Sequence, residues 1–588
     1  MDILGISFSN DAAAALVRDG APVAAVAEER YTRVKHWDGF PAEAVRYCLR
    51  QGDLSLADLD HVAFFWNPAI HLEPRLGRRQ TIRHHAEYLY ALPNQLLQLH
   101  PARPAADLTE QVLHFRDGVA PLRLAYVEHH LAHAASFFVS PFDRAAIVTV
   151  DGYGERPAAL LASGEGSRVT PLERIDFPHS LGSLYAAVTQ HLGFKANSGE
   201  GKVMGLAAYG RPDGEIGRSL RELVRLLPGG RFELDLSYFS YYMERPARVS
   251  PKFVERFGPA RAAEAPLLER HRDLAAGVQA VFEAVYGHLI AAARARTGAR
   301  DLVLAGGAAL NCVANGTVPF QQGFERIYVP PAAGDDGAAL GAALYLHHQH
   351  LGRPRQGVVH DHAHLGPDTD PAEVATALEQ AGCGHARLGD RVPAVAARLL
   401  EDGFFLGWYQ GRAEFGPRAL GARSILADPR PATVKDALNA RVKFREPFRP
   451  FAPSVLEERT EECFVGAGPS PFMLVVRPTR PDRLDSLRAV THVDGGARVQ
   501  TVSRATNPRY YDLIAEFARL TGVPAVLNTS FNVRGEPIVN TPKDALRCFF
   551  TTDLDFLFLG DEVVWKERAR CRAALRAAAP EIELPSLG

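Results

Sequence analysis

Two separate parts of the chain repeat one order of hydrophobic and polar residues. Residues 3–20, ILGISFSNDAAAALVRDG, predict a β-strand, a polar turn, a second β-strand and an Asp-Gly turn. Residues 147–166, IVTVDGYGERPAALLASGEG, follow the same order. An internal duplication predicts two similar half-domains facing each other across a cleft, although two hairpins can also look alike by chance. The polar turns place four side chains at that cleft: Ser9, Asn10, Asp11 and Asp151.

Two later hydrophobic runs each lead through glycine into a helix-like stretch, which favours an α/β fold. Residues 301–316, DLVLAGGAALNCVANG, predict a strand, a Gly-Gly turn and a helix start, an arrangement that presents backbone N–H groups to an anion. Residues 330–345 place Asp335 and Asp336 just before an Ala-rich helix. Gly-rich turns between strands and helices are common in α/β proteins, so a purely structural role stays open for both.

The segment after the second run has no hydrophobic periodicity. Residues 347–367, HHQHLGRPRQGVVHDHAHLGP, are rich in His, Pro and Gly. We interpret this segment as a domain boundary, and we favour a solvated linker over a metal site for its histidines.

Length and charge narrow the class of protein. A chain of 588 residues predicts two or more domains, and a net charge of −2 gives no overall attraction to nucleic acid or to a membrane. The six cysteines contain no C-x-x-C pair, so neither a zinc ribbon nor a disulfide framework is indicated, and a cytoplasmic location is expected. The first residues lack a basic leader pattern, and no stretch is expected to reach the length of a transmembrane helix.

The stretch EHHLAHAASFF, residues 128–138, places His129 and His133 four residues apart in a predicted helix. Side chains at this spacing share one helix face and can hold one metal ion. The zinc-protease motif H-E-x-x-H has the same spacing but needs a glutamate after the first histidine, where this chain has His130. Taken alone, the pair fits ordinary surface or interface histidines, and any acidic ligands must come from elsewhere in the chain.

A second region concentrates positive charge. Between Phe404 and Leu456 there are nine Lys or Arg residues and four acidic residues. The surrounding Gly, Pro and aromatic residues predict packed turns rather than an open helix, and buried cations need phosphate or carboxylate partners. Residues 523–532, VPAVLNTSFN, add a strand that ends in polar groups suited to the same pocket: Asn528, Ser530 and Asn532.

Six motifs occur along the chain in a fixed order: HHLAHAASFFVSPF, NSGEGKVMGLAAYG, GGAALNCVANG, FGPRALGARSIL, VKFREPFRPFAPSV and NTSFNVRGEPIV. Together they resemble the O-carbamoyltransferase family that includes nodulation protein U and the cephamycin and tobramycin carbamoyltransferases. The resemblance extends over roughly residues 3 to 565.

The resemblance implies an α/β protein with two domains. Residues 1–350 would form a duplicated ASKHA-type (Kae1-like) carbamoyl-transfer domain, residues 351–366 a linker, and residues 367–588 an α/β YrdC-like domain that forms carbamoyl adenylate. The implied substrates are carbamoyl phosphate, ATP with Mg²⁺ and a hydroxylated small molecule, such as an antibiotic. Neither nucleic acid nor membrane is implied, and the oligomeric state stays open.

The resemblance also suggests residue roles. Adenylation brings several negative charges together, so preorganised cations are expected around the phosphates. The expected cations are Lys443, Arg445, Arg418 and Arg498. Ser530 and Asn532 are expected to orient the nucleotide or carbamoyl group, and Asn528 is expected to bind in the same pocket. For transfer, an ion site like the family's iron site, holding Fe(II) or another divalent metal, is expected from His129, His133, Asp151 and Asp335. Glu200 and Lys202 are expected in the same cleft, and Gly306, Gly307 and Asn311 are expected to hold the nucleotide.

One position departs from the family pattern. Relatives commonly have His-Asp in the first polar turn, whereas this chain has Asn10 and Asp11. A histidine there would suit proton abstraction from the acceptor hydroxyl, which an asparagine amide does not perform. Either Asp11 or His130 serves as base, or the chain is an altered form with slowed transfer. We favour the second explanation because asparagine resembles histidine in shape and polarity.

Three other functions share parts of this pattern. A tRNA threonylcarbamoyl enzyme has both domain types, but the composition predicts no basic surface of tRNA size. An ASKHA-like sugar kinase would not need the basic second domain. A non-catalytic metal-binding scaffold is the third alternative. Pyrophosphate release that depends on carbamoyl phosphate separates the first interpretation from the last two.

Overall fold

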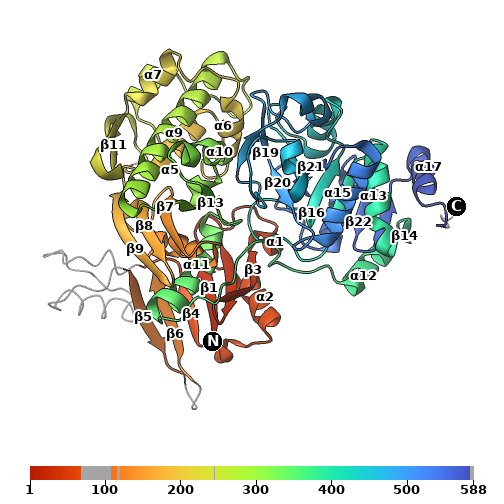
Figure 1. Ribbon diagram of the computed structural model, residues 1–588, viewed down its shortest axis with the longest axis horizontal. Helices are drawn as coiled ribbons and strands as arrows, with labels where there is room; N and C mark the ends of the chain where they lie inside the picture. Colours follow the sequence, from red (N-terminus) through yellow and green to blue (C-terminus); the bar gives the residue numbers. More distant parts are fainter. Residues whose placement is uncertain (68–106, 116–119, 244–245, 583–588) are drawn as a thin grey trace.

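The computed structural model describes residues 1–67, 107–115, 120–243 and 246–582. It is mixed α/β: two sheets with their helices occupy the red-to-green part of the chain in Figure 1, and a further α/β unit occupies the blue part. Strand pairing, rather than sequence proximity, brings the polar turns of the first part together.

The first sheet begins with three consecutive antiparallel strands. β1 (Asp2–Ser7), β2 (Ala13–Arg18) and β3 (Ala21–Ala27) form a meander, and β1 also pairs in parallel with β4 (His61–Phe64). The sheet order is β3-β2-β1-β4-β6-β5, completed by β6 (Leu122–Val127) and β5 (Leu108–Leu113). The small buried alanines of β2 allow a helix to pack closely on its face.

The second sheet repeats this pairing. β7 (Arg144–Val150), β8 (Pro157–Glu165) and β9 (Arg168–Asp176) form an antiparallel meander, and β7 pairs in parallel with β12 (Asp301–Ala305). The sheet order is β13-β12-β7-β8-β9, with β13 covering Arg326–Tyr328. The two stretches predicted to be duplicated therefore begin sheets of matching topology, as expected.

Helix α11 (Asp335–Leu344) packs against β1 and β2 and against α4 (His129–Ala134). Two glycines permit these close approaches. A Cβ atom on Gly5 would overlap the backbone oxygen of Ala339, and one on Gly341 would overlap the backbone oxygen of Ala132. α11 therefore joins the first sheet to the histidine-bearing helix.

The other helices of this part surround the two sheets. They are α1 (Glu29–Thr32), α2 (Ala42–Gly52), α5 (Leu181–His191), α6 (Glu200–Ala207), α7 (Glu215–Arg221), α8 (Pro251–Phe257), α9 (Glu269–Thr297) and α10 (Cys312–Gln321). A short hairpin joins β10 (Val224–Leu226) to β11 (Phe232–Leu234).

The length of α9 corrects one expectation. By length and composition, this helix of 29 residues is apolar enough to cross a membrane, contrary to the prediction that no stretch reaches that length. Its most apolar window is 72% buried inside the structure, as in the core helix of a folded domain. The helix is long because it packs along several elements, including α6, α7 and β7.

The second part of the chain forms an eight-stranded sheet in the order β14-β23-β22-β15-β16-β21-β17-β20. Its strands are β14 (His385–Arg387), β15 (Leu406–Tyr409), β16 (Arg423–Ala427), β17 (Ala452–Leu456), β20 (Gln500–Val502), β21 (Ala525–Ser530), β22 (Phe556–Leu559) and β23 (Glu562–Trp565). Its helices are α12 (Pro371–Ala381), α13 (Val392–Glu401), α14 (Thr433–Leu438), α15 (Pro508–Thr521), α16 (Pro542–Thr551) and α17 (Ala569–Ala578). A small ribbon pairs β18 (Val476–Pro478) with β19 (Gly496–Arg498).

The segment between the two parts has no helix or strand from 351 to 370, and most residues from 352 to 359 are exposed, as expected of a linker. The expectation that its histidines are solvated is wrong for three of them. His347, His348 and His360 are buried. The carbonyl of Leu365 accepts hydrogen bonds from the backbone N–H of Ala25 and from side chains of both parts. The hydrogen bond from Ala25 of β3 satisfies this carbonyl and holds the segment against the first sheet. The domain limits at 350 and 367 remain a prediction.

Candidate functional site

The two histidines of the predicted pair lie on α4, which begins directly after a buried carboxylate. The Glu128 side chain accepts hydrogen bonds from the backbone N–H groups of His130 and Leu131 and so caps the helix. Glu155 accepts a hydrogen bond from the N–H of His129. These contacts fix the start of α4, and the rings of His129 and His133 point toward the same place one helical turn apart.

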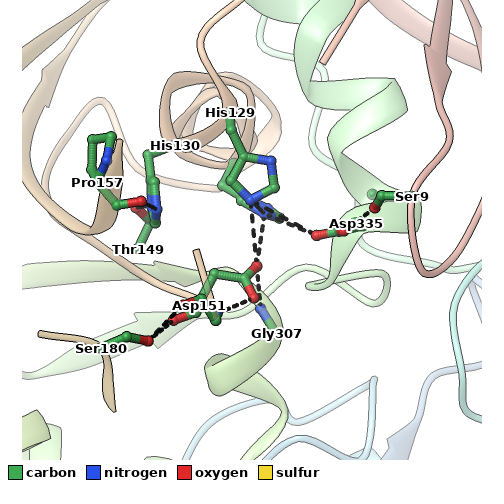
Figure 2. A network of polar contacts seen from close by, with 12 residues as sticks. Ser9, His129, His130, Thr149, Asp151, Pro157, Ser180, Gly307 and Asp335 are labelled. Carbon is green, nitrogen blue, oxygen red and sulfur yellow. Dashed lines mark hydrogen bonds and ion pairs between the residues drawn. The ribbon is translucent and has the colours of Figure 1, made fainter. Parts of the chain in front are cut away.

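Two carboxylates complete the group from distant elements (Figure 2). Asp151 follows the end of β7, and Asp335 is the first residue of α11. His133 Nε2 lies 3.1 Å from Asp151 Oδ2 and 3.7 Å from Asp335 Oδ1. His129 Nε2 lies 3.6 Å from Asp151 Oδ2 and 3.8 Å from Asp335 Oδ1. The structure therefore brings together the four side chains that we expected to meet.

Neighbouring groups hold both carboxylates in place. The backbone N–H of Gly307 donates to Asp151 Oδ2 at 3.0 Å, and that of Gly152 donates to Asp151 Oδ1 at 2.6 Å. The Ser9 hydroxyl, in the turn between β1 and β2, donates to Asp335 Oδ2. Each of the two repeated polar turns thus contributes to one site (Figure 2).

The electrostatics of the group fit a cation. Burial lowers the pKa of His133, but hydrogen bonds to Asp151 and Asp335 outweigh this and raise the pKa to about 9. Burial disfavours the charged form of Asp151, yet its contacts with the two histidines hold its pKa well below the usual range. Two imidazole nitrogens and two carboxylate oxygens within 4.8 Å of one another are a suitable donor set for a divalent transition metal. The set does not select one metal, so Fe(II) remains a prediction.

His130 does not face this group as a base. Its Nδ1 lies 2.7 Å from Thr149 Oγ1 and its Nε2 lies 3.1 Å from the carbonyl oxygen of Pro157 (Figure 2). The ring is fully buried, and burial with two neighbouring histidines lowers its pKa well below the usual value. Since both ring nitrogens have partners, His130 is poorly placed to take a proton from a substrate.

The first polar turn presents Asn10 to solvent, whereas Asp11 contacts His36, a residue that the sequence alone did not indicate. Asp11 Oδ1 lies 2.8 Å from His36 Nδ1. Burial raises the pKa of Asp11, and the hydrogen bond to His36 acts in the opposite direction. No sequence spacing marks His36, because its partners come from other segments.

Several residues expected around the transfer site make contacts that hold the local fold, and their expected roles stay predictions. Gly306 has φ 87° and lies against the backbone of β7, where a side chain would not fit. Asn311 is buried, caps α10 and exchanges hydrogen bonds with Gln279. The Glu200 side chain accepts a hydrogen bond from the N–H of Asn197. These contacts give no support for nucleotide binding by Asn311.

A cavity lies between the two parts of the chain and is lined by residues of the predicted basic cluster. Its volume is about 430 Å³, and it is lined by α6, α9 and α10 on one side and by C-terminal loops and β21 on the other. Five arginines line it. Arg221, at the end of α7, is paired with Asp213, and the other four come from the second part of the chain: Arg418, Arg445, Arg449 and Arg498. Arg449 was not selected from the sequence, although it stands in the quoted motif VKFREPFRPFAPSV. Lys202 joins the two parts nearby through an ion pair of 2.9 Å with Glu446.

Within the described residues, Arg418, Arg445 and Arg498 form no salt bridge, whereas Arg449 lies 4.0 Å from Glu446. Loss of hydration, with Arg498 nearby, lowers the pKa of Arg418 to about 9. Loss of hydration also lowers the pKa of Arg445 well below its usual range, and Arg449 acts in the same direction. The buried Nε of Arg418 has no hydrogen-bond partner in the described part of the protein. A cavity of this kind is suited to an anionic ligand.

Lys443 does not line the cavity itself, but it contacts Ser530, which does, and Asn532. The ammonium group contacts the carbonyl of Ser530 at 2.7 Å and the carbonyl of Asn532 at 2.8 Å. It also lies 2.6 Å from Asn532 Oδ1. Asn528 and Ser530 line the cavity, and the Asn528 amide is anchored in the sheet by hydrogen bonds to Ser454 and Gln500. The predicted cluster from β21 and the basic loop is therefore assembled.

The sequence is similar to known proteins over nearly its whole length. Residues 2–344 match the family model of the carbamoyltransferase N-terminus, and residues 397–566 match that of the carbamoyltransferase C-terminus. In comparison with solved structures, the crystal structure of T. kodakarensis HypF matches with 14% identity and a TM-score of 0.28 over 61% of this chain and 49% of that chain. A likeness this distant supports no conclusion about function.

Curated relatives agree with the family models. The nodulation protein NolNO of Sinorhizobium fredii is 40% identical, covering 96% of this chain and 80% of the relative. Nodulation protein U of Rhizobium tropici is 30% identical over 91% of both chains. A Synechocystis protein named sll1178 is 43% identical over 96% of both. From these matches, the chain belongs to the carbamoyltransferase family of enzymes.

Proposed function

We propose that this enzyme joins carbamoyl phosphate to ATP, giving carbamoyl adenylate and pyrophosphate, and then transfers the carbamoyl group to a hydroxyl of a small-molecule natural product. The observation that carries the proposal is the cavity between the two parts of the chain, where the four arginines of the second part are half-buried and Arg418 and Arg445 lie close to other arginines. Two phosphate-bearing substrates would supply the negative charge that this arrangement needs.

We further propose that residues 1–350 form an ASKHA-type (Kae1-like) transfer domain and residues 367–588 a YrdC-like adenylate-forming domain. The matching topology of the first two sheets supports the first assignment. The basic cavity edge built by β21 and the loop around Arg445 supports the second.

The residues of the cavity have separable tasks in adenylation. The guanidinium groups of Arg418, Arg445 and Arg498 would bind phosphate oxygens and offset their mutual repulsion as the new bond forms. Ser530 lines the cavity, and its hydroxyl would orient the carbamoyl group. Lys443 would fix Ser530 and Asn532 through the contacts that it already makes.

The residues of the His/Asp group belong to the transfer step. A divalent ion bound by His129, His133, Asp151 and Asp335 would supply a Lewis acid for the carbamoyl adenylate. Ser9 and Gly307 would keep the two carboxylates oriented through their present hydrogen bonds. The buried face of α4 would exclude water from this side of the site.

Pyrophosphate release measures the first half of the reaction. The purified enzyme is expected to form pyrophosphate from ATP only when carbamoyl phosphate is present, and Lys443→Ala is expected to abolish it. Lys543→Ala, which removes an exposed lysine on α16, is the matched control. Running the assay with a panel of hydroxylated natural products tests acceptor and reaction together. Full pyrophosphate release by Lys443→Ala would disprove the assignment of the cavity.

A further inference from the structure

Three side chains from separate segments form a hydrogen-bonded chain beside the first polar turn. Asp11 follows β1, His36 lies in the loop after α1, and Ser198 lies in the loop before α6. Asp11 Oδ1 is 2.8 Å from His36 Nδ1, and His36 Nε2 is 2.8 Å from Ser198 Oγ. The His36 side chain is 22% exposed and that of Asp11 is 36% exposed, so the chain can be reached from solvent.

The partners determine how the imidazole is oriented. An ionised Asp11 only accepts, so His36 Nδ1 carries the hydrogen of that bond. The lone pair of Nε2 then faces the Ser198 hydroxyl and can accept its proton. A carboxylate on Nδ1 and a hydroxyl on Nε2 is the arrangement in which histidine acts as general base for an attacking hydroxyl in unrelated enzymes.

The backbone holds His36 in an unusual conformation. His36 has φ 57°, in the left-handed region that few residues other than glycine adopt. Its backbone N–H donates to Glu29 Oε2 at 3.0 Å, and Glu29 in turn pairs with Arg30. Strain of this kind persists where surrounding contacts fix it, and it is concentrated at functional sites.

The first polar turn connects this hydrogen-bonded chain of side chains to the His/Asp group. Asp11 is two residues from Ser9, whose hydroxyl donates to Asp335 Oδ2. Asn10, between them, is exposed and carries an amide that does not take up a proton. The turn that touches the transfer site therefore also carries the carboxylate that orients His36.

Resting on the function proposed above, we propose that His36, oriented by Asp11, is the general base of carbamoyl transfer, and that Ser198 Oγ marks the position where the acceptor hydroxyl binds. The acceptor oxygen forms a bond to the carbamoyl carbon while its proton passes to His36 Nε2. The bond between that carbon and the AMP phosphate oxygen breaks, and its electron pair leaves with AMP. The products are the carbamate ester, AMP and a proton.

Two other uses of these residues make different predictions. Ser198 would become carbamoylated if it were itself the nucleophile. Asp11, Glu29 and His36 also have ligand atoms within 4.8 Å of one another, so they would hold a second metal ion if they were a metal site. The ion pair between Glu29 and Arg30 and the bond between Asp11 and His36 instead give these groups partners without an ion.

The experiment follows both half-reactions in the same full-length, metal-loaded sample. Pyrophosphate reports adenylation, and AMP formed in a single turnover reports attack on bound carbamoyl adenylate, with water and glycerol as acceptor probes. His36→Asn keeps a polar side chain but removes the base, and it is expected to slow AMP formation by about 10²–10⁴-fold with pyrophosphate release nearly unchanged. His385→Asn, on exposed β14, is the control.

Two further variants separate a base from a structural role. His36→Gly suits φ 57° and leaves a space, so added imidazole is expected to restore AMP formation. Ser198→Ala is expected to keep most transfer, and mass spectrometry of the wild-type protein is expected to show no carbamoylated serine. Metal content per chain is expected to be the same in His36→Asn and wild type.

The outcomes are distinguishable. Unchanged AMP formation in His36→Asn with normal pyrophosphate release would overturn the role of His36 alone, as would a wild type that forms AMP no faster than free carbamoyl adenylate decays. Loss of one metal ion in His36→Asn would show instead that His36 belongs to a second metal site. A carbamoylated Ser198 would show instead that this serine is the nucleophile. Absence of pyrophosphate in the wild type would overturn the proposed function itself and this inference with it.

Discussion

The Nε2 atoms of His129 and His133 lie 3.2 Å apart on one face of α4. At that distance one Nε2 must carry a hydrogen that it donates to the other Nε2. Without that hydrogen, the lone pairs of the two nitrogens would face and repel each other. Asp151 and Asp335 surround the same point with negative charge. A proton or a metal ion satisfies this arrangement, and the following predictions distinguish what it does.

Removing one histidine is expected to separate the two half-reactions. His133→Ala should lose the bound metal and product carbamoylation, because it removes one of two nitrogen ligands, while keeping much of the pyrophosphate release. Metal analysis and the two product assays measure this. His191→Ala, which removes a buried histidine on α5, should keep its metal. Equal loss of pyrophosphate and product in His133→Ala would indicate one shared site.

Metal affinity is expected to rise with pH. The pKa of His133 in the metal-free protein is about 9, so at neutral pH an ion must displace a proton from this site. As pH increases toward 9, that competition weakens by about tenfold in the apparent dissociation constant per pH unit for one proton. Chelator competition between pH 6.5 and pH 8.5 measures the slope. A flat profile would mean that binding releases no proton from His133.

Replacing an arginine in the cavity is expected to weaken substrate binding and to raise the stability of the fold. Arg418→Gln removes a cation whose pKa is lowered to about 9 by loss of hydration and by Arg498, so it should weaken mutual repulsion and raise the unfolding midpoint. The same change should raise the KM for ATP or carbamoyl phosphate by about tenfold or more, since it removes a charged hydrogen bond. Arg519→Gln, at an exposed position on α15, should change neither quantity. A less stable Arg418→Gln protein with unchanged KM would contradict both expectations.

Position 10 tests whether the chain is an altered form. If transfer lacks a base, Asn10→His should raise transfer sharply, by up to about 10²–10⁴-fold, and leave carbamoyl-phosphate-dependent pyrophosphate release nearly unchanged. If His36 is the base, Asn10→His should change transfer by less than about tenfold. In the His36→Asn background, however, the same substitution should restore part of the lost rate. Single-turnover AMP formation in the two single variants and the double variant decides between these results.

The local features of this protein could be predicted from its sequence because they depend on spacing within one segment. The four-residue interval between His129 and His133 places both side chains on one helix face wherever the helix lies. The polar turns of residues 3–20 and 147–166 follow from alternating β-runs and turn residues, and β1–β2 and β7–β8 have this form. That Asp151 and Asp335 belong to the same group as the two histidines was expected only from the family resemblance. In the structure, packing of α11 against β1 and α4 brings Asp335 to the histidines.

Only the tertiary structure showed which side chains meet across long stretches of chain. Asp11 and His36 are 25 residues apart and His36 and Ser198 are 162 apart, so no periodicity links them. Arg449 joined the cavity cluster through the approach of the two parts of the chain, and the histidines near 347 became buried by packing against the first sheet. Helix and strand periods fix which face a residue occupies, but burial and partners depend on which faces pack together, and that is decided by the whole fold.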